Sequence, residues 1–171
     1  MKFKIIFIII TNNNMQKLTT LERTNRWFQK YQPNLNETEW QELYLKLIEE
    51  EYNETMNAIK NNNLIEFLDW CIDLYWVQQW YYYFGGTTEN DFVNPFELMF
   101  NYISLEWLQL VQEEMIVDLI HAVADSNYTK VLELQTKWNK VGKVIKWSNF
   151  VKPTEAIKQI IEKYNITFIT E

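Results

Sequence analysis

The chain has few of the residues that make turns, and almost no cysteine. Its 171 residues include three glycines, three prolines and a single cysteine, Cys71. Folds built from many strands and loops need more turn residues than that, so the composition favours helices. We expect an all-α fold: an antiparallel helical bundle with a short extended segment near the C-terminus. One cysteine cannot form an internal disulfide, and we expect a cytoplasmic protein in a reducing compartment.

Basic residues and histidine are scarce as well. Lys and Arg number 16 against 23 Asp and Glu, which gives a net charge of −7. Because phosphate backbones bind basic surfaces, we expect no nucleic-acid partner, whereas a nucleotide held through a divalent cation is compatible with this charge. A single histidine, His121, argues against a histidine-rich zinc site. Ser126 has no evident triad partners, and no glycine-rich phosphate loop occurs.

The N-terminal segment is apolar but short. Residues 3–10 form an apolar run that is too short to span a bilayer as a helix, and no small-residue cleavage site follows it. We therefore expect no membrane partner. Three interpretations stay open: a secretion signal, an early strand or arm that packs on a partner, and an upstream start with the functional chain beginning at Met15. We divide the chain into an N-terminal arm of undefined role, 1–18, and one domain, 19–171.

Helix signals occupy most of that domain. Capping residues, apolar spacing and breakers predict helices over about 20–31, 38–60, 64–83, 95–125, 129–140 and 154–164. The long 95–125 helix has an open alternative, a break near Ser104. Three asparagines, 61–63, make a connection so short that the helices on either side should be antiparallel neighbours. We expect residues 143–147 to be extended and 166–169 to form a β-like tail.

The two helices joined by the asparagines each carry a row of acids. The rows are Glu50, Glu51 and Glu54 in the first helix, and Glu66, Asp69 and Asp73 in the second. At about 100° per residue each row falls on one side of its helix, and the second helix is apolar almost all round. Like charges at this spacing repel one another, and a divalent cation such as Mg²⁺ would remove the repulsion. A solvated polar face is the alternative; we favour a metal site shared by the two rows.

Four stretches resemble, in the same order, the motifs of one family. Residues 50–54 match a Glu-Glu-x-x-Glu motif, and 69–75 look like the Asp-x-x-x-Asp stretch with Leu and Tyr that follows it. Residues 123–130 are similar to Val-His-x-Ser-Asn-Met-Ser-Lys, and 142–153 to a Gly-Lys-Val-x-Lys tail that ends at a proline. The chain, over roughly residues 20–162, resembles the MazG-like all-α nucleoside triphosphate pyrophosphohydrolases, in the branch likened to phosphoribosyl-ATP pyrophosphohydrolase.

The resemblance implies a helical enzyme that assembles as a homodimer or homotetramer and uses Mg²⁺ or Mn²⁺. The expected reaction cleaves a nucleoside triphosphate between the α and β phosphates, giving a nucleoside monophosphate and pyrophosphate. Metal ligands would be Glu50, Glu51, Glu54 and Asp73, with Asp69 and Glu66 as further ligands or outer-shell groups. Asn127 and Lys130 match positions near the phosphates or sugar. For the general base we choose Glu51, which is rotated away from Glu50 on its helix.

The sequence departs from the family pattern in three places. Many relatives carry Glu-x-x-Asp in the second motif, and two registers stay open here: with Asp73 as the final Asp the Glu position holds Trp70, and with Asp69 as the final Asp it holds Glu66 but the Leu-Tyr follows Asp73 instead. Ala124 replaces the usual His, and residues 84–110 look like an insertion. The aromatic stretch 76–84 is interpreted either as core and dimer interface or as a stacking surface for a base. Two other functions stay open: a dimeric enzyme of the dUTPase or dCTPase kind, selective for one pyrimidine nucleotide, and a non-catalytic helical binding protein.

Overall fold

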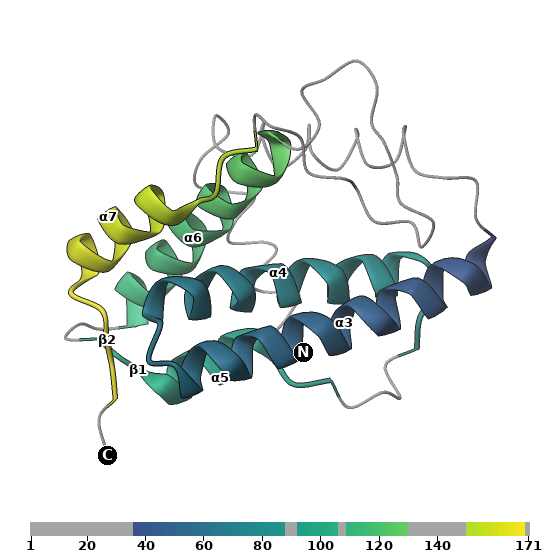
Figure 1. The fold of residues 1–171 in the computed structure, drawn as a ribbon, viewed down its shortest axis with the longest axis horizontal. Helices are drawn as coiled ribbons and strands as arrows, with labels where there is room; N and C mark the ends of the chain where they lie inside the picture. The colour runs from purple at the N-terminus through teal and green to yellow at the C-terminus, as the bar shows by residue number, and fades with distance from the viewer. Residues whose placement is uncertain (1–35, 88–91, 106–108, 130–149, 170–171) are drawn as a thin grey trace.

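The structure is a bundle of helices that a very short sheet closes at one end (Figure 1). It is a computed structural model, and it describes residues 36–87, 92–105, 109–129 and 150–169. Within these ranges the elements are α3 Glu37–Lys60, α4 Leu64–Tyr83, α5 Pro95–Tyr102, β1 Ile103–Ser104, α6 Gln109–Thr129, α7 Thr154–Tyr164 and β2 Thr167–Phe168. The predicted all-α fold class is confirmed. The expected elements at 20–31, 129–140 and 143–147 lie outside the described residues, apart from Thr129 itself.

The pair α3 and α4 forms an antiparallel hairpin, as its three-residue connection predicts. Asn36 begins α3 with a capping box, because its side chain accepts from Glu39 N at 3.0 Å and Glu39 Oε2 accepts from Asn36 N at 2.8 Å. Asn62 turns the chain in the left-handed region, at φ 52°, which asparagine tolerates better than most residues. Asn63 then caps α4 by accepting from Glu66 N. These three local features fix where α3 begins and ends and where α4 begins.

The predicted 95–125 helix is two helices in the structure. Asn94 and Pro95 start α5, and the chain leaves the helix at Ile103, where β1 pairs with β2 in antiparallel register. The break near Ser104 was the open alternative, and it is the correct one. The predicted end near 125 is wrong, since α6 continues to Thr129, whose hydroxyl donates to the Ser126 carbonyl at 2.7 Å.

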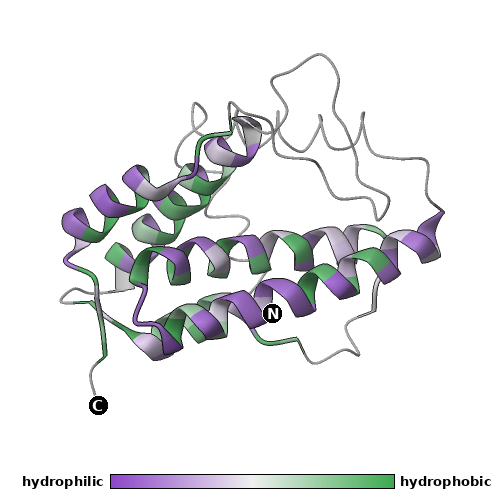
Figure 2. Cartoon of the chain, viewed as in Figure 1, coloured by the Kyte–Doolittle hydropathy of each residue, from purple (hydrophilic) through white to green (hydrophobic). Residues whose placement is uncertain are grey.

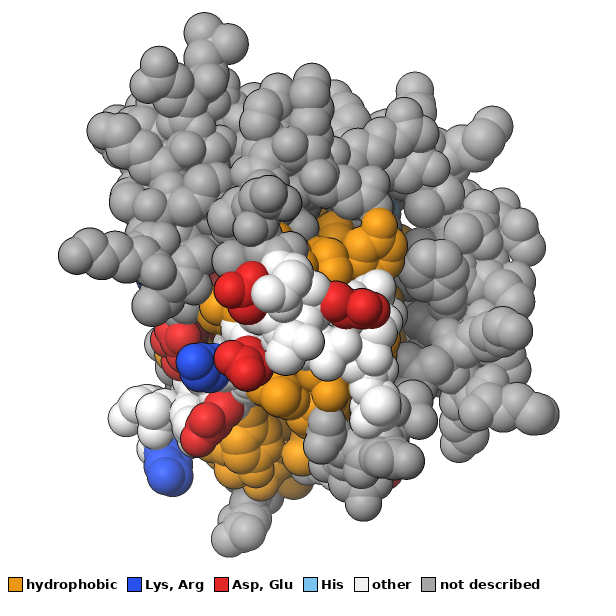
Figure 3. All heavy atoms as spheres, turned by 90° about the vertical axis from the view of Figure 1, so that its right-hand side faces the viewer, with side chains coloured by type: hydrophobic (Ala, Val, Ile, Leu, Met, Phe, Trp, Pro, Cys, Tyr) orange, Lys and Arg blue, Asp and Glu red, His pale blue; other side chains and the backbone are white. Residues whose placement is uncertain are grey.

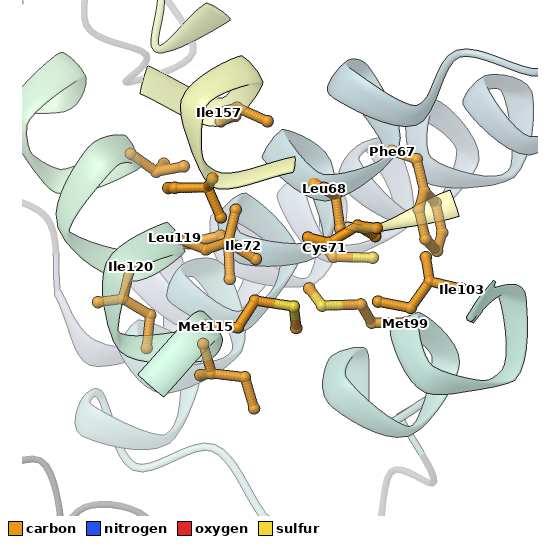
Figure 4. Packing of buried hydrophobic residues seen from close by; sticks show 14 of the residues in the cluster. Phe67, Leu68, Cys71, Ile72, Met99, Ile103, Met115, Leu119, Ile120 and Ile157 are labelled. Atoms are coloured by element: carbon orange, nitrogen blue, oxygen red, sulfur yellow. The ribbon is translucent and has the colours of Figure 1, made fainter. Parts of the chain in front are cut away.

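The main core lies where α4 meets α5, α6 and α7. Figure 4 shows its side chains pointing inward from all four helices and from β1. Residues with no exposed surface include Phe67, Leu68 and Ile72 of α4, Met99 of α5, and Met115 and Leu119 of α6. Cys71 is fully buried among them. In α7 the buried positions are Ile157, Ile160 and Tyr164, and the other side is polar (Figure 2).

A second apolar cluster joins the first half of α3 to the end of α4. Trp40, Tyr44 and Ile48 pack against Leu74, Trp80 and Tyr81, and we call these six residues the aromatic cluster. Phe84 extends it, stacking on Trp40 with 4.8 Å between ring centroids and 9° between planes. Of the predicted aromatic stretch, Trp80 and Tyr81 are therefore core residues, whereas Tyr83 is 61% exposed. Among the described residues, no helix has the length and apolar character needed to cross a membrane.

Candidate active site

The acids of α3 differ in how they face α4. The buried positions of α3 are Trp40, Tyr44, Ile48, Thr55 and Ala58, which form one stripe along the helix. Glu51 falls three residues after Ile48 and four before Thr55, so it lies on the stripe, and it is only half exposed. Glu54, one turn further along, is also half exposed, whereas Glu50 is exposed to solvent. The side of α3 that faces α4 thus carries Glu51 and Glu54.

Four further acids of α3 are exposed to solvent rather than partly buried. Glu37, Glu39, Glu42 and Glu49 are all exposed. Figure 3 views the end of the molecule where α3 begins and shows acidic side chains gathered on that face, beside apolar ones. Most of the acidity of α3 is therefore a solvated surface, and the carboxylates that could act in chemistry are the half-exposed ones.

On α4 the three predicted acids share one partly exposed side. Glu66, Asp69 and Asp73 are each half exposed, although the remaining sides of the helix are largely buried. In the antiparallel hairpin, Glu51 precedes Asn62 by 62 − 51 = 11 residues and Asp73 follows it by 73 − 62 = 11. At a rise of about 1.5 Å per residue, both therefore lie at the same height along the pair. Glu54 comes level with Asp69 and Trp70 by the same reasoning.

A hydrogen bond joins the second acidic row to α6. The Asn127 side-chain amide donates from Nδ2 to Asp73 Oδ1 at 3.2 Å. Both side chains are half exposed, so the contact lies at the edge of the core rather than in it. The bond orients the Asp73 carboxylate and brings together the second and third of the four motifs, 69–75 and 123–130. Asn127 was predicted to lie near substrate, and the structure places it against a predicted metal ligand.

The last predicted motif reaches the same side of α4. The Ser126 hydroxyl donates to the Val151 carbonyl at 2.7 Å, and Val151 N donates to Thr129 Oγ1 at 3.0 Å. These bonds hold the segment before α7 against the end of α6. Lys152 then forms an ion pair with Glu66, with 3.3 Å between Nζ and Oε1. The Ser126 hydroxyl therefore has a structural partner in the Val151 carbonyl.

The donor set suits a hard divalent cation in its chemistry. Carboxylate and amide oxygens are what Mg²⁺ prefers, and α3 and α4 present several at matching heights. Within the ranges that the structure describes, however, no three or more Asp, Glu, His or Cys side chains come together as a ready metal site. The individual ligands therefore stay a prediction. Lys130 lies outside the described residues.

Burial of Cys71 argues against nucleophilic catalysis by its thiol. Desolvation raises the pKa of the Cys71 thiol, so this residue stays protonated at neutral pH and is no nucleophile. Two residues near the site had no individual role predicted from the sequence: Lys152, and Trp76 of the aromatic stretch 76–84. Lys152 gave no signal beyond its place in the last motif, because its partner Glu66 is distant in the chain. Trp76 stands one turn after Asp73, and its indole nitrogen is buried without a hydrogen-bond partner.

Comparison with protein families matches residues 15–103 to the family described as phosphoribosyl-ATP pyrophosphohydrolase. No curated protein and no solved structure matches the chain. The matched stretch contains both acidic rows but ends before Asn127, whose place at the site rests on its bond to Asp73. Because the match spans more than half of the 171 residues, it identifies a nucleotide pyrophosphohydrolase, a hydrolase of phosphoanhydride bonds: the chain belongs to the phosphoribosyl-ATP pyrophosphohydrolase family, within the MazG-like superfamily.

Proposed function

We propose that the protein is a Mg²⁺-dependent nucleoside triphosphate pyrophosphohydrolase that cleaves between the α and β phosphates. The products are a nucleoside monophosphate and pyrophosphate. The observation that carries this proposal is the Asn127–Asp73 hydrogen bond, which joins two motifs far apart in the chain at one point on α4. At that point the half-exposed Glu51 of α3 lies level with Asp73. The amide of α6 thus contacts a carboxylate of α4, and a carboxylate of α3 lies at the same height along the helix pair, on partly exposed positions.

The acids of α3 and α4 are proposed as the ligands of the cation. Glu54 and Asp73 would hold the cation, with Glu50, Asp69 and Glu66 as further oxygen donors. Bound there, Mg²⁺ would neutralise the departing pyrophosphate and lower the pKa of a coordinated water. Mg²⁺ usually takes only one or two protein carboxylates and completes its shell with waters and phosphates, so a preformed cage of three carboxylates is not required.

Glu51 is suited to act as the general base. Its place on the stripe of α3 that faces α4 lets it accept the proton of the attacking water. The water oxygen forms a new bond to the α-phosphorus, the bond from that phosphorus to the α,β-bridging oxygen breaks, and pyrophosphate leaves with the bridging oxygen and its electron pair. Asn127 acts as a positioning residue, because it holds the Asp73 carboxylate. Lys130 remains proposed as a cation near the phosphates.

The family match adds one specific substrate candidate. Its name specifies phosphoribosyl-ATP, which carries the same triphosphate linkage with a modified base. A substrate panel should therefore contain phosphoribosyl-ATP, the ribonucleoside and deoxyribonucleoside triphosphates, dUTP and dCTP. Turnover of one pyrimidine nucleotide alone would favour the dUTPase-like or dCTPase-like alternative, and the absence of all turnover would favour a binding protein.

The decisive experiment measures pyrophosphate release and identifies the nucleotide product. The full chain is assayed with the panel in MgCl₂, in MnCl₂ and with EDTA, and wild type is compared with Glu54→Gln and Asp73→Asn. We expect turnover that EDTA abolishes and that both variants lose, with the helical content retained. Glu42→Gln is the matched control, since it removes one exposed acid of α3 away from the site. Full activity in both variants would place the metal elsewhere, and no turnover with any nucleotide in either metal would end the proposal.

A further inference from the structure

The indole nitrogen of Trp76 is a buried donor without a partner. Of the side-chain nitrogen and oxygen atoms in the described ranges, Nε1 of Trp76 is the one found buried with no hydrogen bond. Buried polar groups are nearly always paired, because an unpaired donor forfeits its bond to water and gains nothing in return. A donor of this kind beside a proposed active site indicates a partner that arrives with the ligand.

The position of Trp76 ties this donor to the site. Trp76 follows Asp73 by three residues on α4, which places both on one side of the helix at a rise of about 4.5 Å. Its ring packs against both the main core and the aromatic cluster, with 6.2 Å between the Trp76 and Tyr75 ring centroids. The indole is therefore held between two rigid bodies of side chains, one turn beyond the carboxylate that Asn127 orients.

We propose that Trp76 binds substrate: its indole N–H donates a hydrogen bond to an oxygen of the bound nucleotide. The inference rests on the proposed function, because it takes the nucleotide phosphates to lie at Asp73. From there the sugar and the neighbouring phosphate oxygens are within reach of a group one turn along α4. An indole donates and cannot accept, so it selects an acceptor oxygen at that place. The apolar packing around the ring keeps water from competing for the N–H.

The test removes the donor and keeps an aromatic side chain. Trp76→Phe should lower kcat/KM roughly 5- to 30-fold, the usual effect of one lost substrate hydrogen bond, mainly through KM. Trp40→Phe is the matched control: it exchanges a buried indole of α3 in the aromatic cluster and should stay within about two-fold of wild type. Trp76→Phe also leaves space where the larger indole packed against both clusters, so circular dichroism and the melting temperature of the ligand-free variant are measured beside those of Trp40→Phe to show that both are folded.

The arms of the assay locate the acceptor. A deficit that disappears with a 2′,3′-dideoxynucleoside triphosphate assigns the bond to the sugar, and a deficit shared by all triphosphates assigns it to a phosphate. Both results support the proposal. Wild-type kcat/KM in Trp76→Phe would overturn it.

A second readout does not depend on turnover or on the variant. In ¹⁵N-labelled wild-type protein, the Trp76 indole N–H signal should move downfield when a non-hydrolysable α,β-methylene triphosphate binds. An indole signal that is unmoved at saturating nucleotide would refute the inference even if the enzyme is active. If no nucleotide is turned over but the signal moves, the proposed hydrolysis fails and the binding inference stands.

Discussion

Replacing Asn127 with aspartate tests the contact on which the site is built. Asn127→Asp is nearly isosteric, and it turns a hydrogen bond to Asp73 into a contact between two carboxylates at 3.2 Å. With an effective dielectric constant of about 20, two unit charges at that separation repel by about 5 kcal/mol. Protonating one carboxyl at pH 7 relieves this at a cost of about 4 kcal/mol, which sets an upper limit. We expect the free energy of unfolding to fall by about 2–4 kcal/mol, because the half-exposed side chains can also move apart.

The loss of stability in Asn127→Asp should grow as the pH rises. The repulsion raises the pKa of one carboxyl in the folded state above its unfolded value near 4. Below about pH 4 both carboxyls are protonated in either state, so the variant loses little there; the deficit grows as the pH rises and is complete above the raised pKa. Urea unfolding followed by circular dichroism at pH 4.5 and pH 7 should show this growth, and at pH 7 the melting temperature should fall by roughly 5–15 °C.

The control and the refuting result are equally specific. Asn57→Asp changes an exposed asparagine of α3 in the same way and should leave stability within about 0.5 kcal/mol of wild type. Saturating Mg²⁺ should stabilise Asn127→Asp if the carboxylates bind the cation, since it relieves the repulsion. If Asn127→Asp is as stable as Asn57→Asp at pH 7, Asn127 does not contact Asp73 in solution.

Two further predictions concern the core. Phe67→Ala should lower the free energy of unfolding by about 3–5 kcal/mol, because Phe67 has no exposed surface and alanine leaves a cavity. Leu45→Ala, at a position 38% exposed, should lower it much less. Urea titration of both variants checks this, and equal losses would contradict the described core. Burial raises the pKa of the Tyr44 hydroxyl and of the Cys71 thiol. In the unfolded chain these pKa values are about 10 for the hydroxyl and about 8.5 for the thiol. The stability that each group contributes is therefore complete below its unfolded pKa and is lost as the pH rises above it. The free energy of unfolding, measured from pH 8 to pH 11, should therefore decline in the alkaline range, and Tyr44→Phe should make the decline shallower; an unchanged slope in this variant would argue against burial of the hydroxyl.

Local signals explain why the α3–α4 hairpin was predictable. Asparagines cap both helices and make the connection, so α4 has the predicted bounds and α3 begins one residue earlier than expected. The two acidic rows could be found for the same reason, since positions on one helix follow from spacing alone. Which acids turn toward the partner helix could not, because that depends on the packing of Ile48 and Thr55 against α4.

Contacts between distant segments explain the rest. The helix α5 ends at Tyr102 because Ile103 and Ser104 pair with Phe168 and Thr167. The local sequence around residue 103 could not predict a pairing with residues this distant in the chain. Similarly, α6 extends through Thr129, where bonds from Ser126 and Thr129 to Val151 anchor the segment before α7. Spacing alone would not have joined Asn127 to Asp73, and only the family resemblance pointed there.

The two apolar clusters, which α4 connects, bear on how the protein unfolds locally. The first half of α3 packs in the aromatic cluster, whereas α5, α6 and α7 pack on the main core, and α4 runs through both. Proteins open in cooperative units of unequal stability, and from this division we expect the start of α3 to open as a unit of its own. Its amide hydrogens would exchange with solvent sooner than those at the centre of α4. Opening of that unit as far as Glu51 would disassemble the site while the main core stays folded, so bound nucleotide should slow exchange along α3 as well as at its points of contact.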